Sequence, residues 1–293
     1  MTDTHADAVL SQFLKKFSGQ VHVPPFPNNI HVLMRALADE DMDTRKLAAL
    51  ILNYPVITAR LISLANSAWA SPTIKVTNVE SACIRLGRSV VKGVGLAIAV
   101  SSSFNTTRCA CFDPVRFWTT SMLVSEGAGL LVSHLPNQPK QADDLQYTAQ
   151  TAGVLHNLGL LWLADNLAVE TAQAFQLRES SMDLTVNQAL MQSLGIDYCT
   201  IGGWIGQQWK LPEVLVEIMQ YHRDPEYKEG GVVLVLLVGA AAKMVNALYQ
   251  PDKQLPDNPY LLPWGIDTEI QQKVFNRLIE KQESIQKMAA TLF

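Results

Sequence analysis

The sequence has few cysteines, no basic leader and no long hydrophobic run. Its 293 residues include four cysteines and no C-x-x-C pair, which excludes the disulfide framework of small secreted domains. The most apolar run, residues 232–242, is far shorter than the ~20 residues that cross a bilayer, so it predicts a buried helix. The first residues lack the basic segment and apolar core of a signal peptide. We therefore expect a cytoplasmic protein that does not contact membranes.

Several catalytic and nucleotide-binding motifs are also missing. The sequence has no G-x-x-x-x-G-K phosphate loop, no G-x-G-x-x-G after a strand and no G-x-S-x-G elbow. None of the six histidines has a second histidine three or four residues away, which excludes an H-E-x-x-H zinc helix. The formal net charge of −4 argues against a protein that coats nucleic acid. We therefore expect no bound cofactor.

Composition and charge indicate a folded chain of two units. Hydrophobic residues make up 48% of the chain, enough to bury a core, and its length favours two domains. Residues 1–110 carry 11 Lys and Arg against 7 Asp and Glu, whereas residues 111–293 carry 12 against 20. Because a polar, poorly periodic segment lies near residues 101–111, we predict domains at 1–110 and 111–293.

Helical periodicity and capping residues dominate the rest of the sequence. Leu47, Leu50 and Ile51 follow the spacing of one helix face, and Asp43 precedes them as a cap. Capping boxes predict helix starts at Thr77 with Glu80 and at Thr185 with Gln188. Asp113-Pro114, with proline at the first helical position, and Asp267 predict two further starts, and Gly87 predicts a helix end. Alternation at 21–23 and 74–76 is too short to found a sheet, so we predict an all-α fold.

The segment A-G-V-L-H-N-L-G at residues 152–159 resembles the A-G-L-L-H-D-I-G signature of HD-superfamily metal phosphohydrolases. In that superfamily the adjacent His and Asp bind a divalent metal, which activates a water molecule against a phosphate ester. Here the two positions are His156 and Asn157. A neutral amide is a poor replacement for a carboxylate ligand.

The first half of the sequence is similar to the HDOD domain, an HD-related output domain of bacterial signalling. The similarity rests on V-P-P-F-P at 23–27, T-A-R-L-I-S-L-A-N-S-A at 58–68, K-V-T at 75–77 and L-G at 86–87. It extends from about Val23 to Val245. The resemblance implies a multi-helix bundle in which a degenerate HD-like part, with a C-terminal arm and helix, packs on an N-terminal helical bundle.

The resemblance also assigns positions to the HD site, and most of them have lost their ligands. The early His of catalytic relatives corresponds to Thr120, the His of a G-x-D-H segment to Tyr198, and the late Asp to Ala242. A His pair before an acidic residue and a proline corresponds to Tyr221 and His222. We therefore predict neither a catalytic residue nor a metal ligand at these positions. The degenerate positions are Thr120, His156, Asn157, Tyr198, Tyr221, His222 and Ala242.

Basic residues of the first half form a second candidate site. Arg85, Arg88 and Lys92 are spaced to share one face of a helix, and Lys75 lies nearby in the sequence. Two interpretations stay open. The residues are a solvated face, or they form a patch that attracts an anion or an acidic partner.

Three hypotheses on function follow. The first is a non-catalytic regulatory module that binds a signalling protein supplied in trans, since no receiver, cyclase or DNA-binding motif is visible. The alternative is an HD-type metal-dependent phosphohydrolase with residual activity on a nucleotide or phosphate ester, through His156, Asn157 and His222. The third is a nucleotide or nucleic-acid sensor, whose few cations would bind only weakly.

Overall fold

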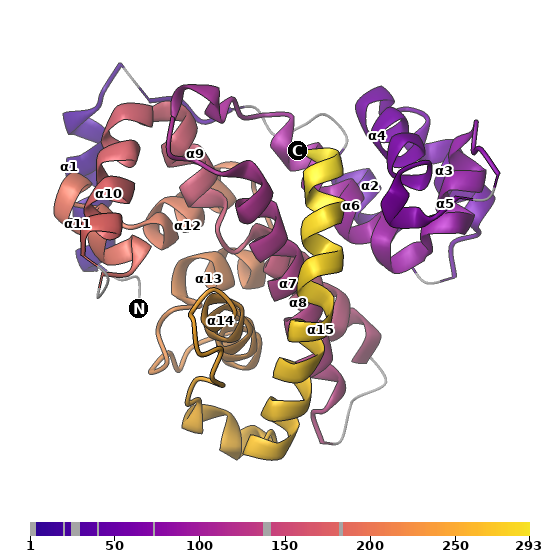
Figure 1. Ribbon diagram of the computed structural model, residues 1–293. Helices are drawn as coiled ribbons and strands as arrows, with labels where there is room; N and C mark the ends of the chain where they lie inside the picture. Colours follow the sequence, from indigo (N-terminus) through magenta and orange to yellow (C-terminus); the bar gives the residue numbers. More distant parts are fainter. Residues whose placement is uncertain are drawn as a thin grey trace. The chain divides into compact units, whose positions relative to one another are not determined.

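The computed structural model describes residues 4–19, 21–24, 30–39, 41–72, 74–136, 142–181 and 184–293. Within these ranges the chain forms helices and no strand (Figure 1), which confirms the all-α prediction. The short alternating segments at 21–23 and 74–76 are irregular. No helix in these ranges is long and apolar enough to cross a lipid bilayer.

The helices form two compact units, and each unit is assembled from segments that are far apart in the sequence. Unit 1 comprises Met1–Pro25, Phe104–Pro114 and Leu155–Gly239, and unit 2 comprises Phe26–Ser103, Val115–Val154 and Ala240–Phe293. This division differs from the predicted domains 1–110 and 111–293, because packing groups segments that the linear charge distribution separates. That the two sequence halves do not fold independently of each other stays a prediction.

Among the residues that the structure describes, unit 1 has six complete helices. They are α1 (Thr4–Lys16), α9 (Leu158–Asn166), α10 (Ala168–Ser180), α11 (Val186–Leu194), α12 (Tyr198–Gln208) and α13 (Glu213–Tyr221), with the short 3₁₀ helix η2 (Thr106–Arg108). Two indoles fix the irregular segment after α1. Trp162 Nε1 donates to the carbonyl of His22 at 2.8 Å, and Trp209 Nε1 donates to that of Pro24 at 2.9 Å.

Unit 2 contains the remaining helices. They are α2 (Ile30–Ala38), α3 (Thr44–Ile51), α4 (Pro55–Ala65), η1 (Ala68–Ala70), α5 (Val79–Leu86), α6 (Arg88–Ser101), α7 (Pro114–Ser133), α8 (Ala142–Leu155), η3 (Pro259–Trp264) and α15 (Thr268–Leu292). The last residue of α8 and the first of α7 belong to unit 1, and α14 (Val232–Ala247) is divided between the units after Gly239.

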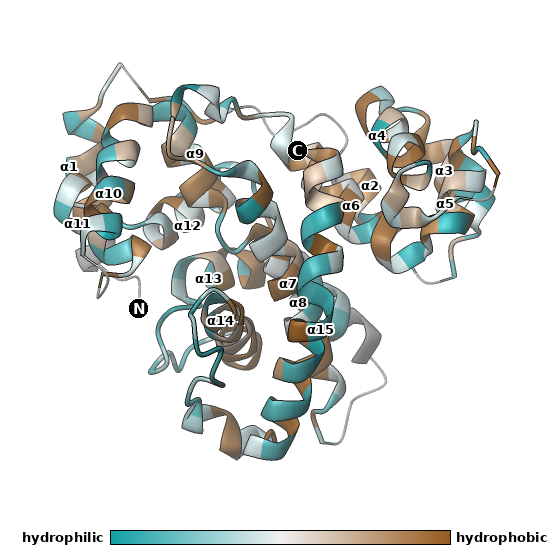
Figure 2. Cartoon of the chain, viewed as in Figure 1, coloured by the Kyte–Doolittle hydropathy of each residue, from teal (hydrophilic) through white to brown (hydrophobic). Residues whose placement is uncertain are grey.

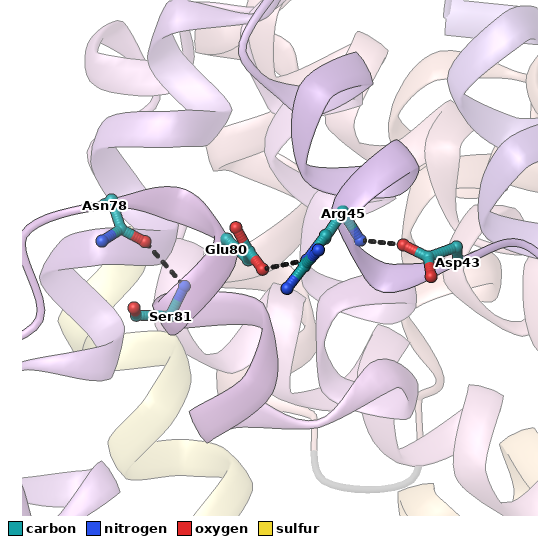
Figure 3. A network of polar contacts seen from close by, with 5 residues as sticks. All are labelled: Asp43, Arg45, Asn78, Glu80 and Ser81. Carbon is teal, nitrogen blue, oxygen red and sulfur yellow. Dashed lines mark hydrogen bonds and ion pairs between the residues drawn. The ribbon is translucent and has the colours of Figure 1, made fainter.

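Caps predicted from the sequence start several helices. The Asp43 carboxylate accepts from the backbone N–H of Arg45 at 2.7 Å at the start of α3 (Figure 3). Both bonds of the predicted capping box at Thr185 and Gln188 are formed at the start of α11. Pro114 is the first residue of α7, and Asp267 caps α15. Side-chain oxygens at these positions satisfy backbone donors that the first helical turn leaves open.

One predicted cap is wrong by one residue. Asn78, not Thr77, caps α5, and its side chain accepts from the backbone N–H of Ser81 at 2.8 Å (Figure 3). Glu80 therefore lies in the first turn and pairs with the Arg45 guanidinium at 3.1 Å. The predicted stop at Gly87 is confirmed, since its φ of +77° is in the region that glycine adopts without strain.

The apolar run at residues 232–242 forms a buried helix, as predicted. It lies in α14, which Figure 2 colours mainly brown. Val235, Leu237 and Val238 have no exposed surface. By contrast, α15 shows alternating teal and brown, and its buried residues recur at helical spacing, as in Val274 and Leu278.

Candidate functional site

The structure brings four predicted or neighbouring side chains together in the interior of unit 1. They are His156, Tyr198, Cys199 and His222, and none exposes more than 7% of its surface. The rings of His156 and His222 meet edge to face with centroids 5.2 Å apart, and the ring centroids of Tyr198 and His222 are 6.0 Å apart. The sulfur of Cys199 lies 3.9 Å from Nε2 of His222. We call these four residues the His156 cluster.

A glycine sets the position of His156 and Asn157. The two residues form the turn between α8 and α9, and both are buried. Two residues later, Gly159 packs so closely on α12 that an added Cβ would lie 2.0 Å from the carbonyl oxygen of Tyr198. Because only glycine permits this approach, α9 and α12 hold the turn close to the first residue of α12.

The start of α12 is fixed by local sequence. Gly195 ends α11 in the left-handed conformation with a φ of +77°. Asp197 then caps α12 by accepting from the backbone N–H of Thr200 at 2.7 Å. The next residue, Tyr198, enters the helix with its side chain in the interior. The G-I-D-Y segment at residues 195–198 therefore positions the Tyr198 phenol in the His156 cluster.

Hydrogen bonds define the state of His222. Its Nδ1 lies 3.0 Å from the carbonyl oxygen of Ile218. Because a carbonyl only accepts, Nδ1 carries the proton of the neutral ring and Nε2 is the acceptor. The Tyr198 hydroxyl lies 3.5 Å from that Nε2. Burial lowers the pKa of His222 well below its ordinary range, and the positive fields of His156 and Arg223 lower it further, so His222 is neutral at pH 7.

Two other groups of the cluster are held in their neutral forms. Burial raises the pKa of the Cys199 thiol to about 12, and the negative charge of Asp197 adds to the shift. Burial also raises the pKa of the Tyr198 phenol. Asn187 supports both residues, since its amide donates to Cys199 Sγ at 3.4 Å and accepts from the backbone N–H of Tyr198. The sequence did not point to Cys199 or Asn187.

The other predicted HD positions have different surroundings. Tyr221 ends α13 and stacks on Tyr227, with ring centroids 4.8 Å apart. Thr120 and Ala242 belong to unit 2. The Thr120 hydroxyl donates to the hydroxyl of Tyr249 at 3.3 Å, and Ala242 is a buried residue of α14.

The His156 cluster and the adjacent Asn157 do not fit a divalent metal. A hard or borderline ion needs several carboxylate, imidazole or thiolate ligands. Asn157 supplies no charge, and the Cys199 thiol is protonated at neutral pH because burial raises its pKa to about 12. In the part of the chain that the structure describes, no three His, Cys, Asp or Glu side chains are placed to hold an ion.

The basic residues do not share a helix face. Arg85 lies in the last turn of α5 and Arg88 begins α6, with Gly87 between them at a φ of +77°. Residues at the spacing i, i+3, i+7 lie on one face only when a continuous helix contains all three. The prediction of one shared face is therefore wrong, because the same glycine that ends α5 turns the chain.

Contacts of the individual basic side chains differ. The Arg85 guanidinium donates to the carbonyl of Ala65 at 3.3 Å, and that of Arg88 donates to the carbonyl of Met42 at 2.7 Å. These two bonds tie α5 and α6 to neighbouring segments of unit 2. Lys75 is exposed. The Lys92 ammonium lies over an aromatic ring, that of Tyr147, 3.4 Å from its centroid.

Comparison with known proteins identifies a family. Residues 23–225, more than half of the chain, match the family model described as the HDOD domain. A curated relative, an uncharacterized protein of Treponema pallidum (strain Nichols), is 22% identical over 242 residues. The match covers 80% of this chain and 44% of that protein, so the chain spans less than half the length of this relative.

Solved structures share the fold. A crystal structure of a candidate signal transduction protein of Marinobacter aquaeolei VT8 has a TM-score of 0.81 at 20% identity, and covers 99% of this chain and 66% of that one. An HDOD domain protein of unknown function from Geobacter sulfurreducens has a TM-score of 0.74 at 20% identity, covering 98% and 99%. A candidate phosphohydrolase of Shewanella amazonensis SB2B has a TM-score of 0.68 at 23% identity, covering 99% of both chains.

Proposed function

The chain belongs to the HDOD domain family. We propose that it is a non-catalytic regulatory module, which acts in signalling by binding a protein partner supplied in trans. The neighbouring structure named as a candidate signal transduction protein supports the signalling role. A nucleotide or nucleic acid is a weaker candidate partner.

The composition of the His156 cluster carries the proposal. His156 and Asn157 occupy the positions of the HD pair, but none of the four residues of the cluster is a carboxylate, and the neutral amide of Asn157 cannot supply the charge that lowers the pKa of a metal-bound water. His222 is uncharged and directs Nδ1 at a backbone carbonyl. These features support a structural use of the HD positions as a hydrogen-bonded interior.

An assay of phosphate-ester hydrolysis tests the absence of catalysis. Purified protein is incubated with bis(p-nitrophenyl) phosphate and with nucleoside monophosphates in the presence of Mg²⁺ or Mn²⁺. We expect no turnover above that of the variant His156→Ala. We also expect no gain for Asn157→Asp, because Thr120, Tyr198 and Ala242 would still supply no metal ligand. Turnover that survives repurification and is lost in His156→Ala would overturn the proposal.

Affinity capture from the native cell extract tests the binding role. The capture is run with and without nuclease, and each recovered protein is then purified and mixed with the chain. We expect a protein whose recovery does not depend on nuclease and which forms a complex of defined stoichiometry. Recovery that depends on nucleic acid throughout would instead favour the sensor hypothesis.

A second candidate function is a metal-dependent phosphohydrolase with residual activity on a nucleotide or phosphate ester. The observation that favours it is the fold shared with the Shewanella amazonensis SB2B protein named as a candidate phosphohydrolase. The same hydrolysis assay separates the two functions.

A further inference from the structure

Unit 2 contains a cavity of about 250 Å³ that is separate from the His156 cluster. Its wall is formed by residues of α6, α7, α8 and α15, with contributions from α2 and η1. An apolar cavity of ~150 Å³ in a protein interior is large enough to bind benzene. This cavity is therefore large enough for a molecule with one or two rings.

The wall of the cavity is apolar on its buried side. Leu96 of α6, Met122 of α7, and Ile285 and Met288 of α15 line it, and each exposes less than a tenth of its surface. Methionine is unbranched and polarizable, so it adapts to aromatic and irregular ligands. This side of the cavity suits a hydrophobic body.

Charged side chains lie at the more exposed part of the wall. Lys92 and Lys281 contribute two positive charges, and Glu126 contributes one negative charge. The Lys92 ammonium lies over the Tyr147 ring, a position in which the ring stabilises a cation. Two of the three charged residues that line the cavity are therefore lysines, in a chain whose formal net charge is −4. This excess of cations in the lining favours an anionic ligand.

Gly93 of α6 also lines the cavity, and a Cβ added there would meet no heavy atom within 4 Å. The hollow thus reaches the backbone of α6. A side chain that begins at this position therefore starts in open space at the wall of the cavity.

We propose that this cavity binds a small amphipathic organic anion, with an aromatic or aliphatic body against Met122 and Met288 and one carboxylate or phosphate group near Lys281. Binding orients the ligand because its two ends meet different parts of the wall. Such a site would give the regulatory module a chemical signal to which it responds.

Calorimetric titration with three naphthalene probes tests the proposal. The probes are 2-naphthoate, naphthalene-2-phosphonate and 2-naphthylmethylammonium, so the two anionic groups are compared with each other and with a cation. We expect 1:1 binding of at least one anion, at least tenfold tighter than the cation. Absence of anion binding at millimolar concentration, or equal affinity for the cation, would overturn the proposal.

Variants locate the site. Gly93→Phe fills the cavity and should weaken binding of the anion at least tenfold, whereas Ile84→Phe adds a ring at an exposed position of α5 and should leave binding unchanged. Lys281→Gln should weaken binding severalfold, and the matched change Lys273→Gln elsewhere on α15 should not. Unchanged affinity in both Gly93→Phe and Lys281→Gln would contradict the assignment.

Methionine-methyl NMR of the unchanged protein gives a readout that does not depend on variants. Added 2-naphthoate should shift the methyl resonances of Met122 and Met288. The methyl of Met219, which is fully buried in α13 of unit 1, should not move. Met34 also lines the cavity, so only shifts confined to methionines other than Met34, Met122 and Met288 would place the ligand elsewhere and refute the proposed site.

Discussion

His222 is a histidine that the fold keeps uncharged. Its ring is buried in the His156 cluster, and burial together with His156 and Arg223 lowers its pKa well below the ordinary value near 6.5. In the unfolded chain the same ring is solvated and takes up a proton below about pH 6.5. The two states therefore bind different numbers of protons in mildly acidic solution.

This difference predicts how stability depends on pH. The contribution of His222 to the free energy of unfolding is fully present above about pH 6.5 and falls as pH decreases, by up to ~1.4 kcal/mol per pH unit. Chemical denaturation between pH 7 and pH 5 measures it. We expect a smaller decrease for His222→Gln than for the unchanged protein.

The exposed His134 provides a matched control for this measurement. His134→Gln removes an exposed histidine and leaves the buried His222 in place, so the decrease between pH 7 and pH 5 should persist. An equal decrease in the unchanged protein and in His222→Gln would contradict the account of His222.

Only part of the cluster could be predicted from single residues. His156, Tyr198 and His222 could be predicted because their sequence contexts resemble HD motifs. Cys199 was not, because its contact with His222 depends on the packing of α12 against α13. The residues next to Cys199 in the sequence do not predict which helix packs against α12.

The start of α5 offers a test of local structure. Asn78 caps the helix (Figure 3). Thr77 precedes it as an exposed residue. We expect Asn78→Ala to lower the free energy of unfolding by about 1 kcal/mol, since the Ser81 N–H loses its acceptor. Thr77→Ala should change it by less than ~0.5 kcal/mol. Urea denaturation of both variants measures these changes. A larger loss of unfolding free energy for Thr77→Ala would show that Thr77, as the sequence predicts, caps the helix.

Thr77 and Asn78 are both good caps, and the choice between them depends on tertiary packing. Val79, Ala82, Cys83 and Leu86 are the buried residues of α5. The helix therefore begins at Val79, one residue later than the T-x-x-E pattern predicts. Caps at Asp43, Thr185 and Asp267 were predicted correctly because each is followed by one clear helical stripe.

The approach of α9 to α12 predicts the effect of one methyl group. In Gly159→Ala the new Cβ would lie 2.0 Å from the Tyr198 carbonyl oxygen and 2.6 Å from the Gly202 nitrogen. Backbone atoms cannot rotate away, so the helices must separate, at a cost of ~1–3 kcal/mol or more.

Gly93→Ala is the matched control for that variant. Gly93 is also helical, but its added Cβ meets nothing within 4 Å, so the better helix propensity of alanine should stabilise the protein by up to ~1 kcal/mol. Thermal unfolding followed by circular dichroism compares the two variants. Equal effects of the same sign would show that the close approach is not present.

The interleaved segments of the two units predict that the chain tolerates no cut near Asn105. Such a cut separates Trp209 from the Pro24 carbonyl in unit 1, and Trp69 from Ser284 in unit 2. We expect each fragment alone to be insoluble or poorly folded, because each unit loses a segment that covers its apolar surface. Coexpression of both fragments should recover folded protein. Two fragments that each unfold cooperatively would refute this.

The all-α fold and the family could be predicted from the sequence, because helical periodicity and the HDOD strings are local. The grouping of segments into units could not, since charge composition follows the linear chain. The cavity at Gly93 could not be predicted from the sequence either, because its wall combines residues of α6, α7, α8 and α15. Residues such as Met122 and Met288 are ordinary core residues in the sequence.

The metal content of the purified protein tests the central claim, that the HD positions no longer form a metal centre. Protein is purified without chelator and without a metal-affinity column, and iron, manganese and zinc are measured by elemental analysis. The account predicts less than about a tenth of an equivalent of each, because the described residues include no group of three His, Cys, Asp or Glu side chains that could hold a divalent ion. One equivalent of any of these metals, lost in His156→Ala, would contradict it.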